Sequence, residues 1–159
     1  MEHELLKGLS PGEVDRVLQL GTRMTIPSEG SLFCLGDSAD RLFLVERGRI
    51  RLTFPMLIRG HAEDVFIEEK SPGETVGWSA LVPPYRFTLS ATAPMESQVI
   101  ALPRETLCRL CEDSPVVGAR IGLNLAVVVA HRLQLVQAMW MREIERTVEM
   151  KSAVAAEAR

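Results

Sequence analysis

Short segments with the period-two pattern of β-strands fill the chain between residues 22 and 103. Turn residues separate one segment from the next at intervals of about eight to twelve positions. A stretch of about eighty residues built in this way, with no long helix inside it, is typical of an antiparallel barrel or sandwich. The expected strands are Thr22–Ile26, Ser31–Cys34, Arg41–Glu46, Arg49–Phe54, Val65–Lys70, Glu74–Val76, Phe87–Ala93 and Ser97–Leu102.

The third of these segments shows the alternation most clearly. Leu42 and Leu44 are predicted to lie on one face of the strand, and Phe43 and Val45 on the other. Gly48 follows at a tight hairpin position that favours a positive φ angle. We therefore predict a mainly β fold with flanking helices: an eight-stranded antiparallel jelly roll, or β-roll, of the double-stranded β-helix type.

A helical pattern precedes the β-rich region. Residues 2–20 are predicted to be helical, because apolar residues recur at spacings of three and four. Ser10 is the expected N-cap, with Pro11 at the first helical position and Glu13 as the partner in a capping box. Residues 1–103 would thus form an N-terminal helix plus a β-roll sensor.

A second helical region follows the strands. A short helix is expected over Arg104–Glu112, and a long one from Val116 to at least Glu149. We assign residues 104–159 to this hinge helix and long helix, which together with the roll form a single domain.

The C-terminal half of the long helix carries apolar residues in the pattern of a coiled-coil seam. The helix is also longer than a barrel roughly 30 Å across. The same helix of a second copy is the simplest partner for such a seam, and packing on the chain's own barrel is the alternative. The predicted dimer-interface residues are Val129, Leu133, Val136, Trp140, Ile144 and Val148.

A glycine-rich stretch between the sixth and seventh expected strands could bind an anion. Gly73 and Gly77 flank a short extended segment, and residues 78–81 can form one helical turn. The start of such a turn presents unpaired N–H groups, and Arg86 offers a fork of donors suited to phosphate or carboxylate. A plain connection between two strands, with a surface arginine, is the alternative.

Composition and charge limit the function classes. The chain has 159 residues, of which 47% are hydrophobic and 25% charged, as in one globular domain. Its net charge of −3 argues against direct nucleic-acid binding. Cys34, Cys108 and Cys111 are too few for a disulfide framework, so a reducing cytoplasm fits. The N-terminus lacks a signal-peptide segment, and the longest apolar run, Leu125 to Ala130, is too short to span a bilayer. No membrane partner is therefore expected.

The order of these elements resembles the cyclic-nucleotide-binding domain of the catabolite-activator/FNR family, over nearly the whole chain. Residues 32–50 look like its early strands with a Gly-Asp turn and a glycine hairpin. Pro72–Gly77 looks like the start of its phosphate-binding cassette, and His131–Gln134 like its dimer-helix signature. The resemblance implies a homodimeric, cytoplasmic regulatory domain that senses a ligand and is not an enzyme. The family's helix-turn-helix domain would be lacking, since the chain ends at Arg159.

Two cassette positions depart from the pattern of the family. Cyclic-nucleotide binders place a glutamate after the second cassette glycine to hold the ribose hydroxyl, and Trp78 stands there. They place an arginine before a Ser/Thr-Ala pair to neutralise the cyclic phosphate. Counted back from residues 89–91, that position is Tyr85, and Arg86 is one residue later, where a strand would turn it to the opposite face. Relatives that bind cAMP also present hydroxyl groups from the long helix, where this chain offers Gln137.

These departures predict a regulatory domain with altered or lost specificity for cAMP. No cofactor is expected with certainty; a cyclic nucleotide, or another flat, small anionic ligand held largely by stacking, could bind. Arg86 stacked on Trp78 or Tyr85 could instead close the pocket with no ligand. The predicted ligand-binding residues are Gly73, Glu74, Gly77, Trp78, Ser79, Ala80, Tyr85, Arg86, Phe87, Thr88 and Gln137.

Two other functions are compatible with the same fold. One is a ligand-free scaffold or partner-binding module. The other is a metal-dependent, cupin-like enzyme, which is disfavoured because His3, His61 and His131 are scattered and no His-x-His pair with a following glutamate occurs.

Overall fold

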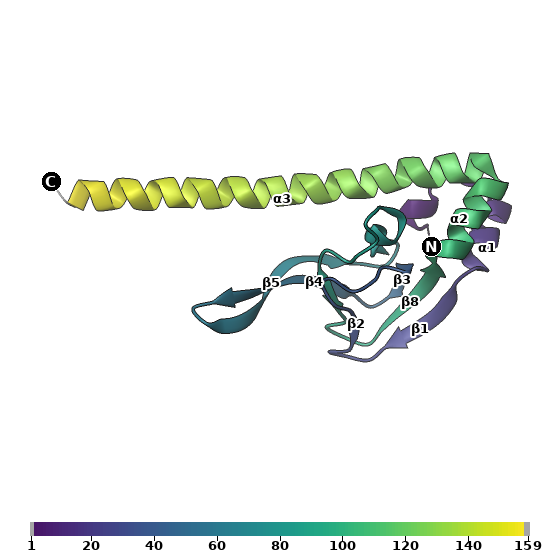
Figure 1. Cartoon of the computed structure of the whole chain (residues 1–159), viewed down its shortest axis with the longest axis horizontal. Helices are drawn as coiled ribbons and strands as arrows, with labels where there is room; N and C mark the ends of the chain where they lie inside the picture. Colours follow the sequence, from purple (N-terminus) through teal and green to yellow (C-terminus); the bar gives the residue numbers. More distant parts are fainter. Residues whose placement is uncertain (1, 158–159) are drawn as a thin grey trace. The chain divides into compact units, whose positions relative to one another are not determined.

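The structure, a computed structural model, describes the backbone of residues 2–157 and the side chains of residues 2–152. The chain divides into two compact units, Met1–Leu125 and Ala126–Arg159. The first unit contains every described strand, together with the helices α1 and α2 and the first turns of α3 (Figure 1). The second unit is the remainder of α3.

The strands form two antiparallel sheets of four strands each, with the orders β1-β8-β3-β6 and β2-β7-β4-β5. This arrangement confirms the predicted eight-stranded roll. The strands are β1 Thr22–Ile26, β2 Ser31–Phe33, β3 Arg41–Arg47, β4 Ile50–Ile58, β5 His61–Lys70, β6 Thr75–Val76, β7 Ser90–Thr92 and β8 Ser97–Pro103.

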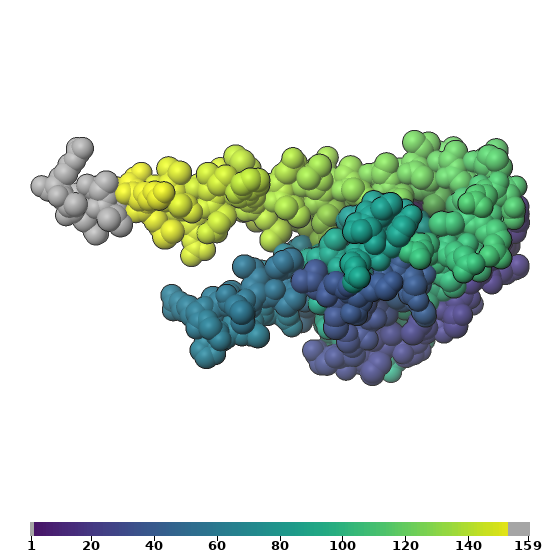
Figure 2. All heavy atoms as spheres, in the orientation of Figure 1, coloured from purple at the N-terminus to yellow at the C-terminus, as the bar shows by residue number. Residues whose placement is uncertain are grey.

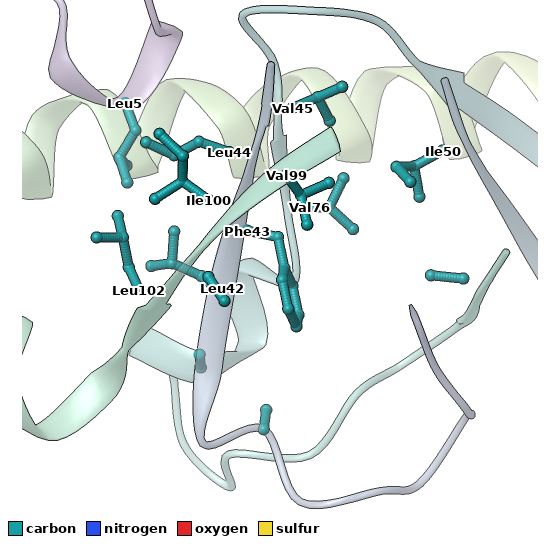
Figure 3. Packing of buried hydrophobic residues seen from close by; sticks show 14 of the residues in the cluster. Leu5, Leu42, Phe43, Leu44, Val45, Ile50, Val76, Val99, Ile100 and Leu102 are labelled. Carbon is teal, nitrogen blue, oxygen red and sulfur yellow. The ribbon is translucent and has the colours of Figure 1, made fainter. Parts of the chain in front are cut away.

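Strand β3 is buried on both faces, and both faces contribute to one hydrophobic core. Leu44 lies with Leu5 and Ile100 on one side of the strand, and Phe43 lies with Val99 on the other (Figure 3). Leu5 and Leu6 of the N-terminal segment belong to the same core. Sequence periodicity assigned the two faces correctly.

The N-terminal helix is shorter and more broken than predicted. A single 3₁₀ turn, η1 (Glu4–Leu6), is followed by the α-helix α1 (Pro11–Leu18). The continuous helix expected over residues 2–20 is wrong, because Gly8 turns the chain at φ +79° and Ser10 then starts a new helix. The predicted capping box is confirmed: the backbone N–H of Ser10 donates to the Glu13 carboxylate at 2.7 Å, and the Glu13 N–H donates to the Ser10 hydroxyl at 3.4 Å.

Strands β4 and β5 are longer than predicted and form a hairpin that projects from the roll (Figure 2). Their pairing continues from Ile50↔Lys70 to Ile58↔His61. The two-residue turn at Arg59 and Gly60 has positive φ angles of 52° and 83°, which suit a tight hairpin. Pro55 is tolerated because β7 pairs with β4 only as far as Thr53, so beyond that point one edge of β4 needs no N–H donor.

Strand β7 is shorter than the predicted Phe87–Ala93. The backbone of Phe87 bonds instead to the loop before β3: Gly36 N–H donates to Phe87 O at 2.8 Å, and Phe87 N–H donates to Asp37 O at 3.0 Å. These bonds keep residues 86–89 out of the regular ladder. The chain therefore enters β7 only at Ser90.

Two helices follow the roll, as predicted. Helix α2 spans Arg104–Asp113, and α3 spans Pro115–Glu157 as one continuous helix. By length and composition alone, the part of α3 from Pro115 to Ser152 is long and apolar enough to cross a membrane. That is weak evidence, because core helices of soluble proteins pass the same test.

Within the second unit, the seam residues of α3 are mostly exposed in the single chain. Trp140 has 68% of its surface exposed, and Leu133, Val136, Ile144 and Val148 also expose large fractions of theirs. Val129 is half-buried. Pairing with a second copy stays a prediction.

Candidate ligand-binding cassette

The cassette, residues 73–87, begins at a glycine turn whose polar groups are satisfied within the chain. Gly73 has φ +93°, and a Cβ added there would lie 2.9 Å from the carbonyl oxygen of Glu2. The carboxylate of Glu74 accepts hydrogen bonds from the Ser71 N–H at 2.7 Å and from Lys70 Nζ at 3.2 Å. Glu74 is therefore bound to the turn after β5.

Gly77 is the N-cap of a 3₁₀ helix, η2 (Trp78–Leu81), and adopts φ +77°. Ser79 and Ala80 are buried, and the Ala80 N–H donates to Gly77 O at 3.0 Å. Trp78 is half-buried. The one-turn helix predicted at residues 78–81 is present, with the positive φ that favours glycine just before it.

An aromatic ring lies directly against Gly77. A Cβ added to Gly77 would come within 2.9 Å of Phe87 Cε1 and 3.5 Å of the Phe43 ring. Phe87 stacks on Phe33 with ring centroids 3.6 Å apart and planes 10° from parallel, and Phe33 in turn stacks on Phe43 at 5.8 Å. Phe87 is only 5% exposed. The side chain that reaches the cassette glycine is thus apolar.

Tyr85 is not part of this aromatic stack, and its role in ligand binding stays a prediction. Its backbone has φ +56°, an unusual value for a bulky residue, and its side chain is 39% exposed. The guanidinium carbon of Arg104 lies 4.4 Å from the centroid of the tyrosine ring. The ring of Tyr85 thus pairs with Arg104 rather than with Arg86, for which Tyr85 and Trp78 were the two cation–π partners considered.

Arg86 is engaged with the loop before β3. Its Nη1 donates to the carbonyl oxygen of Gly36 at 2.8 Å, and its backbone forms an isolated antiparallel bridge with Ser38. The side chain is exposed, as is that of Thr88. Arg86 therefore ties the end of the cassette to the Gly-Asp turn.

Three side chains around the cassette have partners within the chain. Phe87 is the side chain next to Gly77, whereas Arg86 bonds to Gly36 O and Arg104 lies over Tyr85. The two guanidinium groups are thus engaged with Gly36 and Tyr85, and an aromatic ring lies beside Gly77.

A small cavity of about 220 Å³ opens beside the aromatic stack. Asp40 lies at its rim, where Arg41 donates two hydrogen bonds to it at 3.1 and 3.2 Å. The guanidinium of Arg41 thereby lowers the pKa of the Asp40 carboxyl. The cavity has apolar walls and a polar rim, and is lined by Met24, Leu32, Phe33, Asp37, Ser38, Asp40, Arg41, Phe43 and Phe87.

Sequence reasoning missed Phe33, Phe43 and Arg104 as partners of the cassette. Each stands in or beside a predicted strand or helix, where its type indicates only core or surface. Gln137, the residue predicted to reach the ligand from the long helix, lies in the second unit and is exposed in the single chain. Its role in binding stays a prediction.

Other chemical groups are sparse in the described part of the chain. The three cysteines are free, and burial raises the pKa of the Cys111 thiol, with smaller contributions from Cys108 and Glu112. Among the described residues, no group of three or more histidine, cysteine, aspartate or glutamate side chains is placed to hold a metal ion.

The comparison with protein families returns one description. Residues 23–114 match the model of the cyclic nucleotide-binding domain. The matched region runs from β1 through α2 and therefore includes the whole cassette.

Two known proteins are similar to more than four fifths of the chain. The chain is 32% identical over 130 residues to the cyclic AMP receptor protein of Thermus thermophilus, covering 82% of this chain and 57% of that protein. It is 30% identical over 132 residues to Glutaminase 1 of Bradyrhizobium diazoefficiens, covering 83% of this chain and 20% of that protein. The chain thus spans little more than half of the first relative and a fifth of the second.

Among solved structures, the fold is similar to that of the Thermus thermophilus catabolite activator protein. The TM-score is 0.73 at 29% identity, with 90% of this chain and 63% of that chain covered. The two-sheet roll, the cassette before β7 and the match over more than half of the sequence agree: the chain belongs to the cyclic nucleotide-binding domain family.

Proposed function

We propose that this protein is a homodimeric regulatory domain that senses a ligand and whose specificity for cAMP is altered or lost. The observation that carries the proposal is the Phe87 ring, which lies against Gly77 and stacks on Phe33. An apolar, stacked ring at that place disfavours a cyclic phosphate. It favours a flat ligand that can stack, with few charges.

The polar groups around the ring support the same proposal. Trp78 follows the cassette glycine, so no carboxylate stands there to hold a ribose hydroxyl. Truncating one partner of a buried charge pair typically costs about 3–5 kcal/mol. A site without both the ribose carboxylate and the phosphate arginine would therefore bind cAMP weakly at most.

Dimerisation and signalling form the second part of the proposal. The apolar seam of α3, which includes Leu133 and Trp140, is suited to the same seam of a second copy. Movement of the cassette on ligand binding would reposition α2 and α3 and change how the two copies pair. We place the protein in the cytoplasm, with no membrane or nucleic-acid partner.

A ligand-free scaffold is the second candidate, and one observation favours it. The aromatic stack fills the space next to Gly77, and Glu74 and Arg86 already have partners within the chain. A domain closed in this way could serve only as a partner-binding module.

Titration calorimetry with cAMP, cGMP and cyclic dinucleotides tests the proposal. Trp140→Phe leaves Trp78 as the only tryptophan, whose fluorescence then reports on the cassette directly. We expect no heat with cAMP from the wild-type chain. The double variant Trp78→Glu, Phe87→Arg supplies a carboxylate and a guanidinium, and we expect it to gain binding of cAMP.

Micromolar binding of cAMP by the wild-type chain would contradict altered specificity. Binding of another flat ligand with a change in Trp78 fluorescence would favour the sensor. If none of these ligands binds to a chain that is folded and dimeric, the result would favour the scaffold. Phe87→Leu is the matched control, because it opens space beside Gly77 without adding a charge.

A further inference from the structure

The N-terminal strap, residues 2–9, touches two parts of the first unit. It contacts the start of the cassette on one side and the first turns of α3 on the other. Leu5 and Leu6 anchor it in the core, with 0% and 3% of their surfaces exposed. The strap therefore has a fixed position from which polar contacts can reach both elements.

On the cassette side, Glu4 makes two hydrogen bonds. Its backbone N–H donates to Gly73 O at 2.9 Å, and its carboxylate Oε1 accepts from the Thr75 N–H at 2.7 Å. Thr75 is only 1% exposed, so its N–H would be buried without a partner if the carboxylate were removed. The neighbouring residue Gly73 has room for the strap only because it lacks a side chain, since a Cβ would lie 2.9 Å from Glu2 O.

On the helix side, Asn124 holds the strap with a single amide. Its Nδ2 donates to Leu5 O at 2.8 Å and to Lys7 O at 2.9 Å. Both acceptors are backbone groups that η1 leaves without helical partners of their own, since the turn ends at Leu6. Asn124 lies within the compact first unit, which ends at Leu125.

We propose that the strap couples the cassette to α3, with Glu4 and Asn124 as the positioning residues. The two sets of bonds are made by adjacent residues, Glu4 and Leu5, so the strap is too short to absorb a displacement at one end without passing it on. A shift of Thr75 would thus reach Asn124 through one peptide unit. The biological use of this coupling rests on the proposed sensor function. The coupling itself is proposed for the ligand-free chain.

Hydrogen exchange on the ligand-free full chain tests the coupling. Asn124→Leu removes the amide but keeps the branched shape of the side chain, and the hydrogen bonds that it removes go to Leu5 and Lys7 rather than to Gly73 or Thr75. We expect it to speed exchange of the Thr75 amide about threefold or more, because loosening the strap loosens Glu4. Glu4→Gln, which weakens the bond directly, should speed exchange at Thr75 by about tenfold, as expected for losing a charge-assisted hydrogen bond.

Gly122→Ala is the matched control on the same helix. A Cβ at Gly122 meets nothing within 4 Å, and the residue is exposed, so exchange at Thr75 should stay at the wild-type rate. Faster exchange at Leu5 and Lys7 in Asn124→Leu, with Thr75 unchanged, would overturn the proposal.

A reciprocal measurement covers the outcome in which Asn124→Leu fails to fold. In Glu4→Gln, the side-chain amide protons of Asn124 should exchange faster and their NMR signals should shift, since coupling acts in both directions. An unchanged Asn124 amide in a folded Glu4→Gln chain contradicts the coupling. Neither experiment uses a ligand, so a failure of the proposed sensor function would leave both results as they stand.

Discussion

Apolar side chains are buried in the cassette region but exposed along the C-terminal part of α3. In the cassette region, Phe33, Phe43 and Phe87 stack on one another and are all buried. Along α3 after Leu125, Trp140 and Leu133 expose more than half of their surfaces in the single chain. The rings of the first region are covered within one chain, whereas the apolar residues of the second are exposed in it.

This difference indicates where the protein can respond to its surroundings. Where rings are already stacked and polar groups already hydrogen-bonded, a ligand binds only if its own contacts replace those that it breaks. Exposed apolar residues of the seam lower the free energy of the protein only when a second surface covers them. We therefore expect substitutions in the seam to change assembly, and substitutions in the cassette to change stability.

The largest effect is expected from charges placed in the seam. Val136→Asp would bury two carboxylates between the paired helices, one from each copy, at a cost of about 2 kcal/mol each. The dimer dissociation constant should rise about a thousandfold, which sedimentation equilibrium measures directly. Gln134→Asp, an exposed position beside the seam, should leave the dimer intact. If the wild-type chain sediments as a monomer at every concentration, the seam of α3 is not a dimer interface.

The second effect concerns the completeness of the cassette. Phe87→Ala removes a ring that is 5% exposed and stacked on Phe33, and the free energy of unfolding should fall by about 3–5 kcal/mol. Phe54→Ala is a control on the projecting hairpin, where the ring is 40% exposed, and should cost about 1 kcal/mol or less. Urea unfolding followed by circular dichroism measures both. Equal losses would mean that Phe87 contributes no more than a surface ring.

A smaller effect separates ring contact from backbone strain at Gly77. Gly77→Ala forces a methyl group to within 2.9 Å of Phe87 Cε1 at φ +77°. Gly36→Ala has a similar φ of +88° but meets nothing within 4 Å, so it isolates the backbone cost of about 1–2 kcal/mol. Unfolding free energies should show a greater loss for Gly77→Ala, and the excess should vanish in a Phe87→Ala background. An excess that persists there would place its cause elsewhere.

Much of the roll could be predicted from sequence because its signals are local. The capping box at Ser10 and Glu13, the bounds of β1 and the two faces of β3 all follow from spacing within a few residues. The broken N-terminal helix was missed because a single glycine at φ +79° outweighs apolar periodicity there.

The contents of the cassette could not be predicted, because they depend on contacts between distant segments. Phe33 and Phe87 both follow strand-like patterns, and nothing in either pattern indicates that their rings meet. The loop at Gly36 and Asp37 bonds to the Phe87 backbone and so decides which side chains between Tyr85 and Phe87 turn inward. The same limit explains why Arg104 was not expected over Tyr85.

The smallest effect is a pH dependence from the strap. His3 is buried, and burial lowers the pKa of its imidazole below the ordinary 6.5, opposed by the nearby carboxylate of Glu46 and aided by the charge of the N-terminus. The unfolded chain then binds a proton more readily than the folded chain below pH 6.5, so stability present at neutral pH falls as the pH drops through that value.

Urea unfolding at pH 7.5 and 5.5, compared between the wild type and His3→Gln, isolates this contribution from that of the carboxylates. The wild type should lose more unfolding free energy on acidification than the variant. The difference should be smaller than about 1.4 kcal/mol per pH unit, the value expected for the uptake of one full proton. His61→Gln is the control, because His61 is exposed on the hairpin and should give the wild-type dependence. If His3→Gln and the wild type lose stability in parallel, burial does not lower the pKa of His3 in the folded chain. The closure of the cassette would then rest on the aromatic stack and on the hydrogen bonds of Glu4, which do not involve this imidazole.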